Sequence, residues 1–279
     1  MATAPLGGTA GERAPAAGPG NAASGAGAPS LVTKATGVVA GAVPDRAFAS
    51  VIAYAHLRFE PVLRHVKSFV GPHQTALDVG AWYGPWTWWL SRTARQVVTV
   101  EANPEMAAFV ARTARANVEV IAKAAAESAG TAQLWLPAGG RGTEGRASLT
   151  PQGEGRTIPV ETIRLDSLDV TDLGVIKIDV EGHELAALRG AEGLVERFRP
   201  TLVVEIEDAR ASAAPILELL DGWGYAGSYL QDGVWRPLDG FDIAGYQRAM
   251  AGQLGGSYLS LVVSGAGKSH VNTIVFRPR

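Results

Sequence analysis

The sequence predicts a doubly wound α/β fold with a mostly parallel central sheet. From residue 73 onward, short apolar runs alternate with helical stretches, as they do where helices join parallel strands. Glycine-rich or acidic turns follow three of these runs, and ligands of open α/β sheets bind at the carboxyl ends of the strands. The chain has 279 residues, of which 47% are hydrophobic, so a buried core is feasible.

Three segments are expected. Residues 1–30 are rich in Ala, Gly and Pro, and such a tail buries too little apolar surface to offset its ordering entropy, so we expect it to be disordered. Residues 31–72 form an N-terminal helical extension, in which Phe48, Ile52, Phe59 and Leu63 recur at helical spacing. Pro61 should divide or kink this helix. Residues 73–279 form the main domain.

Within the main domain, each apolar run predicts a strand and each amphipathic stretch a helix. The expected strands are 75–80, 96–101, 118–122, 133–136, 157–165, 174–180, 201–206, 225–230 and 271–276. The expected helices are 85–94, 104–116, 185–198, 214–223 and 241–251.

Composition excludes several classes of function. The chain has no cysteine, so it has no disulfide, thiolate metal site or cysteine nucleophile. Its net charge of −2 argues against a broad nucleic-acid-binding surface. No apolar run reaches the roughly 20 residues that span a bilayer, and no signal peptide is recognisable, so we expect a cytoplasmic protein that binds no membrane. The oligomeric state is left open.

The first chemical motif is the turn after the strand at 75–80, with the sequence Asp-Val-Gly-Ala-Trp-Tyr-Gly. Gly80 and Gly84 allow a ligand to approach the backbone closely. A dinucleotide fingerprint needs glycine where Trp82 stands, and an aspartate at Asp78 would repel a pyrophosphate but suits a cationic ligand. An ordinary strand–helix turn is the alternative.

The second motif is Glu101, which ends the next strand. A carboxylate at this position can accept hydrogen bonds from both hydroxyls of a ribose. Asn103 and Pro104 then open a helix, with proline at its favoured early position. A solvated carboxylate at a strand end is the alternative interpretation.

The third motif, residues 178–184, begins within the end of the strand at 174–180 and contains Asp179, Glu181, His183 and Glu184. Such clusters shift each other's pKa values and are candidates for acid–base catalysis. Alternatively, the two glutamates are present because acidic side chains stabilise a helix N-terminus. Glu205 and Glu207 end the neighbouring strand, where they and Asp179 could hold a divalent cation, although we predict no metal site.

Two further segments have features of functional loops. Residues 265–269 resemble the end of a phosphate-binding loop, but the required first glycine is Val262, so a turn is predicted. The Arg-rich loop at 139–156, with Arg141 and Arg146, is either a lid over the substrate or a surface loop.

In their order along residues 75–208, these motifs resemble the FkbM-type methyltransferase family. The matching stretches are LDVGAWYG, VTVEANP, AAAESAG, IRLDSL, IKIDVEGHELAALRGA and RPTLVVEIE. The resemblance implies a Rossmann-like, seven-stranded class I methyltransferase fold and methyl transfer from S-adenosylmethionine, usually to a hydroxyl oxygen. The acceptor would be a small molecule such as a sugar or a natural-product scaffold; the net charge is the reason that no nucleic-acid partner is expected.

The resemblance also implies roles for individual residues. Asp78, Gly80 and Gly84 would shape the cofactor turn, Glu101 would hold the ribose, and the backbone near Ala125 would line the adenine. The residues that we also expect beside the cofactor are Ala81, Tyr83 and Asn103. Trp82 departs from the family pattern, which commonly has asparagine there, so a polar cofactor contact from this side chain is not expected.

The candidate general base is His183, followed by Asp179 and then Glu181. Two rival functions share the predicted fold. A nicotinamide-dependent oxidoreductase is disfavoured by Trp82, and a non-catalytic nucleotide-binding module is disfavoured by the intact acidic cluster at 179–184.

Overall fold

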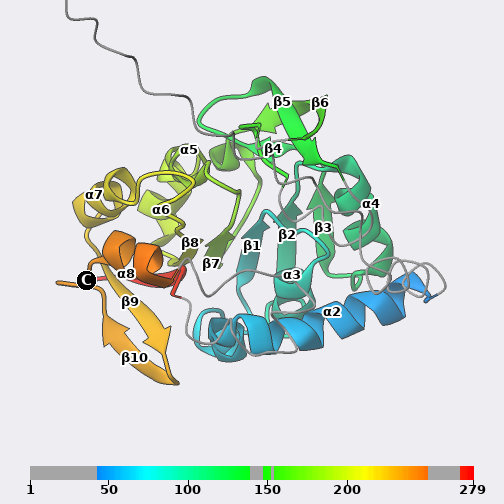
Figure 1. Ribbon diagram of the computed structural model, residues 1–279. Coiled ribbons are helices and arrows are strands. Elements are labelled where there is room, and N and C mark those ends of the chain that lie inside the picture. The colour runs from blue at the N-terminus through cyan, green and yellow to red at the C-terminus, as the bar shows by residue number, and fades with distance from the viewer. Residues whose placement is uncertain (1–42, 139–146, 152–153, 251–270) are drawn as a thin grey trace, which may run out of the picture.

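The computed structural model describes residues 43–138, 147–151, 154–250 and 271–279 (Figure 1). The helices are α2 (Asp45–Phe59), η1 (Pro61–Ser68), α3 (Pro85–Leu90), α4 (Pro104–Thr113), η3 (Leu165–Ser167), α5 (Glu184–Arg189), α6 (Glu192–Phe198), α7 (Ala214–Gly222) and α8 (Ile243–Met250). The strands are β1 (Thr75–Val79), β2 (Gln96–Val100), β3 (Val118–Ile121), β4 (Ala124–Ala125), β5 (Gly130–Pro137), β6 (Gly155–Ile163), β7 (Leu173–Ile178), β8 (Thr201–Glu205), β9 (Tyr225–Gln231), β10 (Val234–Pro237) and β11 (Thr273–Pro278).

The central sheet has the strand order β10-β9-β11-β8-β7-β1-β2-β3. Strands β3, β2, β1, β7 and β8 are parallel neighbours, whereas β11 runs antiparallel to both β8 and β9. The mostly parallel α/β sheet is therefore confirmed. The eighth strand, β10, was not predicted: it extends β9 as an antiparallel hairpin at the edge of the seven strands that the family resemblance implied.

Both faces of the sheet are buried, which is why its strands are almost continuously apolar. In β1, Leu77 packs in a core that is completed by residues of α5, α6 and α7. The adjacent Ala76 points to the opposite face and packs in a core formed with η1 and α3. This alternation between two helical layers gives the doubly wound arrangement.

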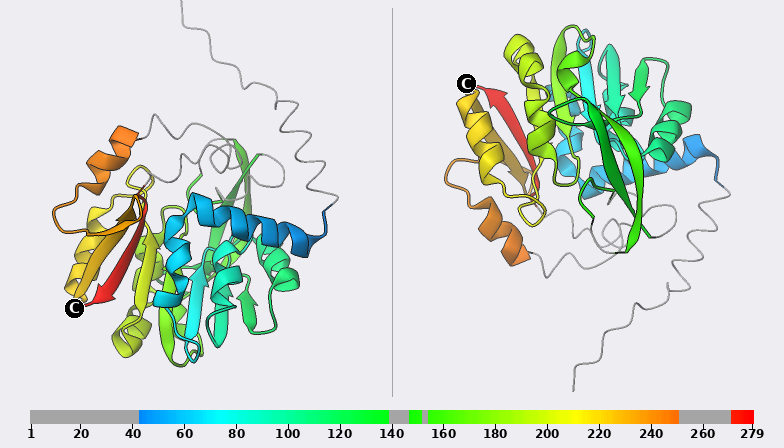
Figure 2. Two further views of the ribbon diagram at one scale, coloured as in Figure 1. Left: turned by 90° about the horizontal axis from the view of Figure 1, so that it is seen from below. Right: turned by 90° about the horizontal axis from the view of Figure 1, so that it is seen from above.

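A second, three-stranded sheet lies outside the main one, in the order β4-β6-β5. Its antiparallel β5–β6 hairpin accounts for the two predicted strands that interrupted the α/β rhythm. Seen from above in Figure 2, this hairpin lies in front of the main sheet, over the end where the pocket described below opens.

The N-terminal helices pack onto the domain. As predicted, the helix breaks at Pro61: α2 ends at Phe59, and η1 is a separate 3₁₀ helix. Helix α2 runs across one side of the domain in contact with α3 and α4 (Figures 1 and 2). Buried Glu60, between α2 and η1, accepts hydrogen bonds from Trp86 Nε1 at 2.8 Å and Thr273 Oγ1 at 2.9 Å. Buried polar contacts therefore join the extension to the main domain.

One predicted helix proved to be two. Instead of a single helix over 185–198, α5 ends at Arg189 and α6 begins at Glu192. The Gly190 backbone packs so closely on the Ala126 carbonyl that an added Cβ would lie 2.2 Å from its oxygen. Asp166 then accepts a hydrogen bond from the Leu194 N–H at 3.0 Å, so its carboxylate caps the start of α6 from a distant segment.

Candidate active site

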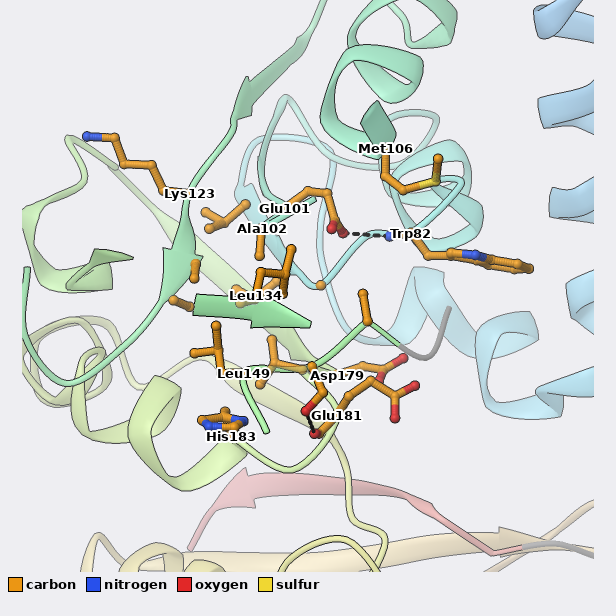
Figure 3. Close-up of a pocket in the computed structure, with 18 residues that line it drawn as sticks. Trp82, Glu101, Ala102, Met106, Lys123, Leu134, Leu149, Asp179, Glu181 and His183 are labelled. Atoms are coloured by element: carbon orange, nitrogen blue, oxygen red, sulfur yellow. Dashed lines mark hydrogen bonds between the residues drawn. The ribbon is translucent and has the colours of Figure 1, made fainter. Parts of the chain in front are cut away.

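A pocket opens at the carboxyl ends of β1, β2 and β7, beneath the β5–β6 hairpin (Figure 3). It encloses about 640 Å³, including the part that is open to solvent. Glu101 and Trp82 lie on one side, and Asp179, Glu181 and His183 lie on another. The three predicted motifs therefore meet at one site, as expected for the switch point of a doubly wound sheet.

The turn after β1 forms one wall. Gly80 has a φ of +79°, and a Cβ on it would lie 1.7 Å from the Asp179 carbonyl oxygen, so only glycine fits. Trp82 also adopts a left-handed conformation, with a φ of +53°. Such a conformation costs on the order of 1–3 kcal/mol for a residue other than glycine and requires support from its surroundings. That support includes a hydrogen bond from the Trp82 N–H to the Glu101 carboxylate at 2.8 Å.

Glu101 is buried, with 7% of its surface exposed, and lines the pocket. Its Oε2 accepts the Trp82 N–H, and its Oε1 accepts the Asn103 N–H at 2.8 Å. Burial raises the pKa of Glu101, while these backbone donors oppose the shift. Each carboxylate oxygen has a second lone pair, so the group can accept further hydrogen bonds from a ligand.

Other residues of the first two motifs lie behind the pocket rather than along it. Asp78 is fully buried; its Oδ2 accepts the Thr87 hydroxyl at 2.5 Å, and its Oδ1 has no partner among the described residues. Burial raises the pKa of Asp78. Tyr83 packs edge-on against the rings of Phe48 and Phe109. The Asn103 side chain caps α4 by accepting the Glu105 N–H at 3.0 Å.

Ala81 and Gly84 are likewise buried and do not line this pocket, whereas Ala125 does. Of the eight residues expected beside the cofactor, the pocket is thus lined by Gly80, Glu101 and Ala125. Sequence reasoning missed four lining residues that carry no motif of their own: Ala102, Met106, Lys123 and Leu134. Ala147, Ser148 and Leu149, which also line the pocket, belong to the 139–156 loop that the sequence offered as a possible lid.

Asp179 enters the pocket from the end of β7, next to a lysine that sequence reasoning overlooked. Lys177 is only 4% exposed, and its Nζ lies 3.2 Å from both Asp179 Oδ2 and the Gly80 carbonyl oxygen. Although burial favours the neutral carboxyl, the Lys177 charge and a hydrogen bond from Glu205 hold the pKa of Asp179 below its ordinary value. The signal in the sequence was a charged residue within an otherwise apolar strand.

Glu181 follows in a strained conformation, with a φ of +53°. Burial and the nearby Asp179 carboxylate raise the pKa of Glu181 to about 8, against the Arg210 guanidinium, which lies 2.5 Å from its Oε2. Arg210 also pairs with Glu207. The buried Ser148 hydroxyl donates to the Glu181 carbonyl at 2.9 Å, which joins the segment beside β5 to this loop.

His183 lines the pocket immediately before α5. Burial lowers the pKa of His183, so the imidazole is neutral at pH 7. Its Nδ1 is buried and has no hydrogen-bond partner among the described residues. Glu184 has a different role: its Oε1 accepts the N–H groups of Val180 at 3.2 Å and Gly182 at 3.0 Å, and so organises the loop.

The other features considered from the sequence are a metal site, two loops and a membrane span. Within the described part of the chain, no group of His, Asp and Glu residues is arranged to hold a metal ion. Glu205 hydrogen-bonds to Asp179, and Glu207 pairs with Arg210. Residues 265–269, Arg141 and Arg146 lie outside the described residues. No helix among those described is long and apolar enough to cross a membrane.

Comparison with known proteins identifies the family. A family model described as "Methyltransferase FkbM domain" matches residues 78–226, more than half of the chain. The chain belongs to the FkbM methyltransferase family. Its cofactor is S-adenosylmethionine, the methyl donor of these enzymes. The nicotinamide-dependent oxidoreductase is thereby removed as an alternative.

Similar solved structures include a methyltransferase FkbM from Methylobacillus flagellatus, with 14% identity and a TM-score of 0.46 over 74% of this chain and 44% of that protein. An rRNA methylase from Streptococcus thermophilus has 10% identity and a TM-score of 0.43, over 78% of this chain and 95% of the other. A Streptococcus mutans protein in complex with SAH has 10% identity and a TM-score of 0.42, over 78% and 96%. No curated protein matches the sequence.

Proposed function

We propose that this FkbM-family chain is an O-methyltransferase that methylates a hydroxyl group of a small molecule, such as a sugar or a natural-product scaffold. The observation that carries the proposal is His183, a neutral imidazole in the wall of the pocket that also contains Gly80 and Glu101. Attack by an alcohol is helped by a base that removes its proton, and a neutral imidazole can accept that proton.

The residues on one side of the pocket fit the cofactor. Gly80 offers its backbone without a Cβ, and Glu101 retains lone pairs for the two ribose hydroxyls. Ala102, Met106 and Leu134 provide apolar surface suited to an adenine ring beside Ala125. The unpartnered Asp78 Oδ1 behind the turn is suited to a cationic group or a bridging water. When bound, S-adenosylmethionine supplies the electrophilic methyl group that the acceptor oxygen receives.

The opposite side of the pocket would handle the acceptor. His183 would take the proton from the acceptor hydroxyl, and its buried Nδ1 leaves the rest of the ring to face the pocket. Asp179 is a weaker candidate base than the sequence suggested, because its lowered pKa makes it a poor proton acceptor. Glu181 is protonated at pH 7, since its pKa is about 8, and would act as a base only in alkaline solution.

The charge of this wall supports a small, non-polyanionic acceptor. The carboxyl groups of Asp179, Glu181 and Glu207 lie together, and the partly buried Arg210 pairs with the last two. Lys177 pairs with Asp179, and the chain carries a net charge of −2. A phosphate backbone would meet repulsion here rather than the cationic surface that nucleic-acid-binding proteins present.

The test is methyl transfer from radiolabelled S-adenosylmethionine to a panel of hydroxylated acceptors, with amines and RNA included. For any acceptor found, His183→Gln should lower kcat/KM by about 100-fold or more, which is the usual contribution of a general base. His73→Gln, an exposed histidine remote from the pocket, is the matched control. In the wild type, kcat/KM should fall on the acid side with an apparent pKa below 6.5, because burial lowers the pKa of His183.

Three results would contradict the proposal. Near-normal turnover by His183→Gln would remove the assigned base. Transfer to RNA or to amines alone, with every hydroxyl acceptor inert, would replace the proposed reaction with another methylation. Tight binding of the cofactor without transfer to any acceptor would favour the non-catalytic module.

A further inference from the structure

A buried lysine lies behind the pocket wall, in contact with two of the residues that line it. Lys177 lies in the centre of the sheet, and its ammonium contacts the Asp179 carboxylate and the Gly80 carbonyl, each at 3.2 Å. These two partners end β7 and β1, the strands whose exits form the pocket. Burial alone would lower the pKa of Lys177, but the surrounding carboxyl groups reverse that effect and raise it, so the side chain stays charged.

Asp179 has a second partner on the other neighbouring strand. Its carboxyl group is hydrogen-bonded to that of Glu205, at the end of β8. Two carboxyl groups can form such a bond only if one of them carries a proton. The Lys177 ammonium lies 3.2 Å from Asp179 Oδ2, which favours Asp179 as the ionised partner and Glu205 as the donor. In agreement, burial and the Asp179 charge raise the pKa of Glu205 well above its ordinary value. Asn272 also donates its amide N–H to Glu205, which fixes the orientation of that acid.

The arrangement continues on the side away from the pocket. Glu60 is buried and accepts from Trp86 Nε1 and Thr273 Oγ1, and His56 Nε2 lies 3.0 Å from its carboxylate. Its negative charge faces Lys177 from the N-terminal helices. Lys177 is therefore held between carboxyl groups of separate elements, and it has little freedom to leave Asp179.

We propose that Lys177 and Glu205 are positioning residues that hold the Asp179 carboxylate as a fixed anion in the wall of the cofactor pocket. Lys177 compensates the charge of Asp179 from one side, and the Glu205 carboxylic acid donates to it from the other. A preorganised anion of this kind favours a cationic ligand without reorganisation on binding. The inference rests on the proposed placement of the cofactor in this pocket, and it makes Asp179 an electrostatic group rather than the proton acceptor.

Several charged groups face the Asp179–Glu205 pair and set its pH dependence. They are Asp78 on β1, Lys177 on β7, Glu181 and Glu184 after β7, Glu207 and Arg210 after β8, and Glu60 with His56 at the N-terminal helices. Among them, Glu181 has a pKa of about 8, and its own titration would overlie that of Glu205. The pH experiment is therefore done in a Glu181→Gln background.

The first measurement is the Kd of S-adenosylhomocysteine by calorimetry at pH 7, for full-length variants checked by circular dichroism and thermal melting. Glu205→Gln should bind within about threefold of wild type, because its amide still donates to Asp179. Glu205→Ala and Lys177→Met should bind about tenfold or more weakly, because each leaves the buried Asp179 short of a partner. Lys177→Arg should recover part of the loss. Lys67→Met and Glu196→Ala, both exposed, are the matched controls.

The pH dependence separates positioning from mere packing. In the Glu181→Gln background, affinity should fall as rising pH removes the Glu205 proton and places two carboxylates against each other. Adding Glu205→Gln should abolish that fall, since an amide does not titrate. If Lys177→Met does not fold, the contrast between Glu205→Ala and Glu205→Gln decides the question.

Wild-type affinity and an unchanged pH profile in folded Glu205→Ala would overturn the inference. Because the readout is binding of the demethylated cofactor, it is independent of the acceptor. A wild type that binds S-adenosylhomocysteine but methylates no hydroxyl would refute the proposed function and leave this inference standing. No binding by wild type would refute the placement of the cofactor, on which the inference rests.

Discussion

Replacing Glu101 by glutamine tests the cofactor site most directly, because this carboxylate both shapes the turn and lines the pocket. Its two oxygens accept the backbone N–H groups of Trp82 and Asn103, each at 2.8 Å. A glutamine amide keeps one accepting oxygen, so one buried N–H loses its partner, at a cost of about 1–3 kcal/mol. For a chain of this size, Tm should fall by roughly 2–4 °C for each kcal/mol lost.

The effect on the cofactor is separate from the effect on stability. If Glu101 holds the ribose, Glu101→Gln replaces a charge-assisted hydrogen bond with a weaker or missing one. The loss of about 1.5–3 kcal/mol corresponds to a Kd for S-adenosylhomocysteine that is roughly 10- to 150-fold weaker. Glu101→Ala removes both backbone acceptors as well, so it should lose binding and more stability together.

The assay is calorimetric titration with S-adenosylhomocysteine, combined with the ligand-induced rise in Tm for each variant. Glu119→Gln, at an exposed position on β3, is the matched control and should behave as wild type in both measurements. The reasoning would be refuted if Glu101→Gln melted at a lower temperature but bound the ligand with the wild-type Kd. Glu101 would then support the turn without touching the ribose.

Three further predictions follow from the same structure. Gly80→Ala should lower the free energy of unfolding in urea by about 3 kcal/mol or more, because the new Cβ would meet the Asp179 carbonyl oxygen at 1.7 Å. Gly84→Ala, whose nearest contact would be 3.3 Å, should cost about 1 kcal/mol, and equal losses would contradict this ranking. Asp166→Ala should lose about 1–2 kcal/mol through the lost cap of α6, and an unchanged urea midpoint would show that the cap contributes nothing. Burial lowers the pKa of His183 in the folded protein, so as pH falls the imidazole takes up a proton more readily in the unfolded chain, and the free energy of unfolding should fall below pH 6.5. His183→Gln should remove that part of the acid dependence, and an unaltered profile would show that the His183 pKa is not perturbed.

Much of the site was predictable because parallel strands end at one edge of a sheet. Gly80, Glu101 and Asp179 each follow a recognisable apolar strand, and the topology alone brings them together. The tight turn at Gly80 was also readable, since only glycine accepts its backbone conformation next to β7. Tyr83 shows where this reasoning stops: it is adjacent to the turn in sequence, yet its ring packs into the aromatic core with Phe48.

The sequence by itself determined most of the strands and helices, the family and the three motifs, because periodicity, turn chemistry and motif spacing are local properties of the chain. It missed β10 and the break between α5 and α6. Only the tertiary structure decided how the charges of the site are compensated. Lys177 and Glu205 belong to different strands, and Glu60 precedes the first strand of the sheet. No spacing in the sequence therefore predicts that these three groups interact. Burial of a charge depends on what packs above and below it, and hydrogen bonding between two carboxyl groups depends on their distance in space. The raised pKa of Glu205 and the lowered pKa of Asp179 are therefore properties of the folded protein and not of the motif.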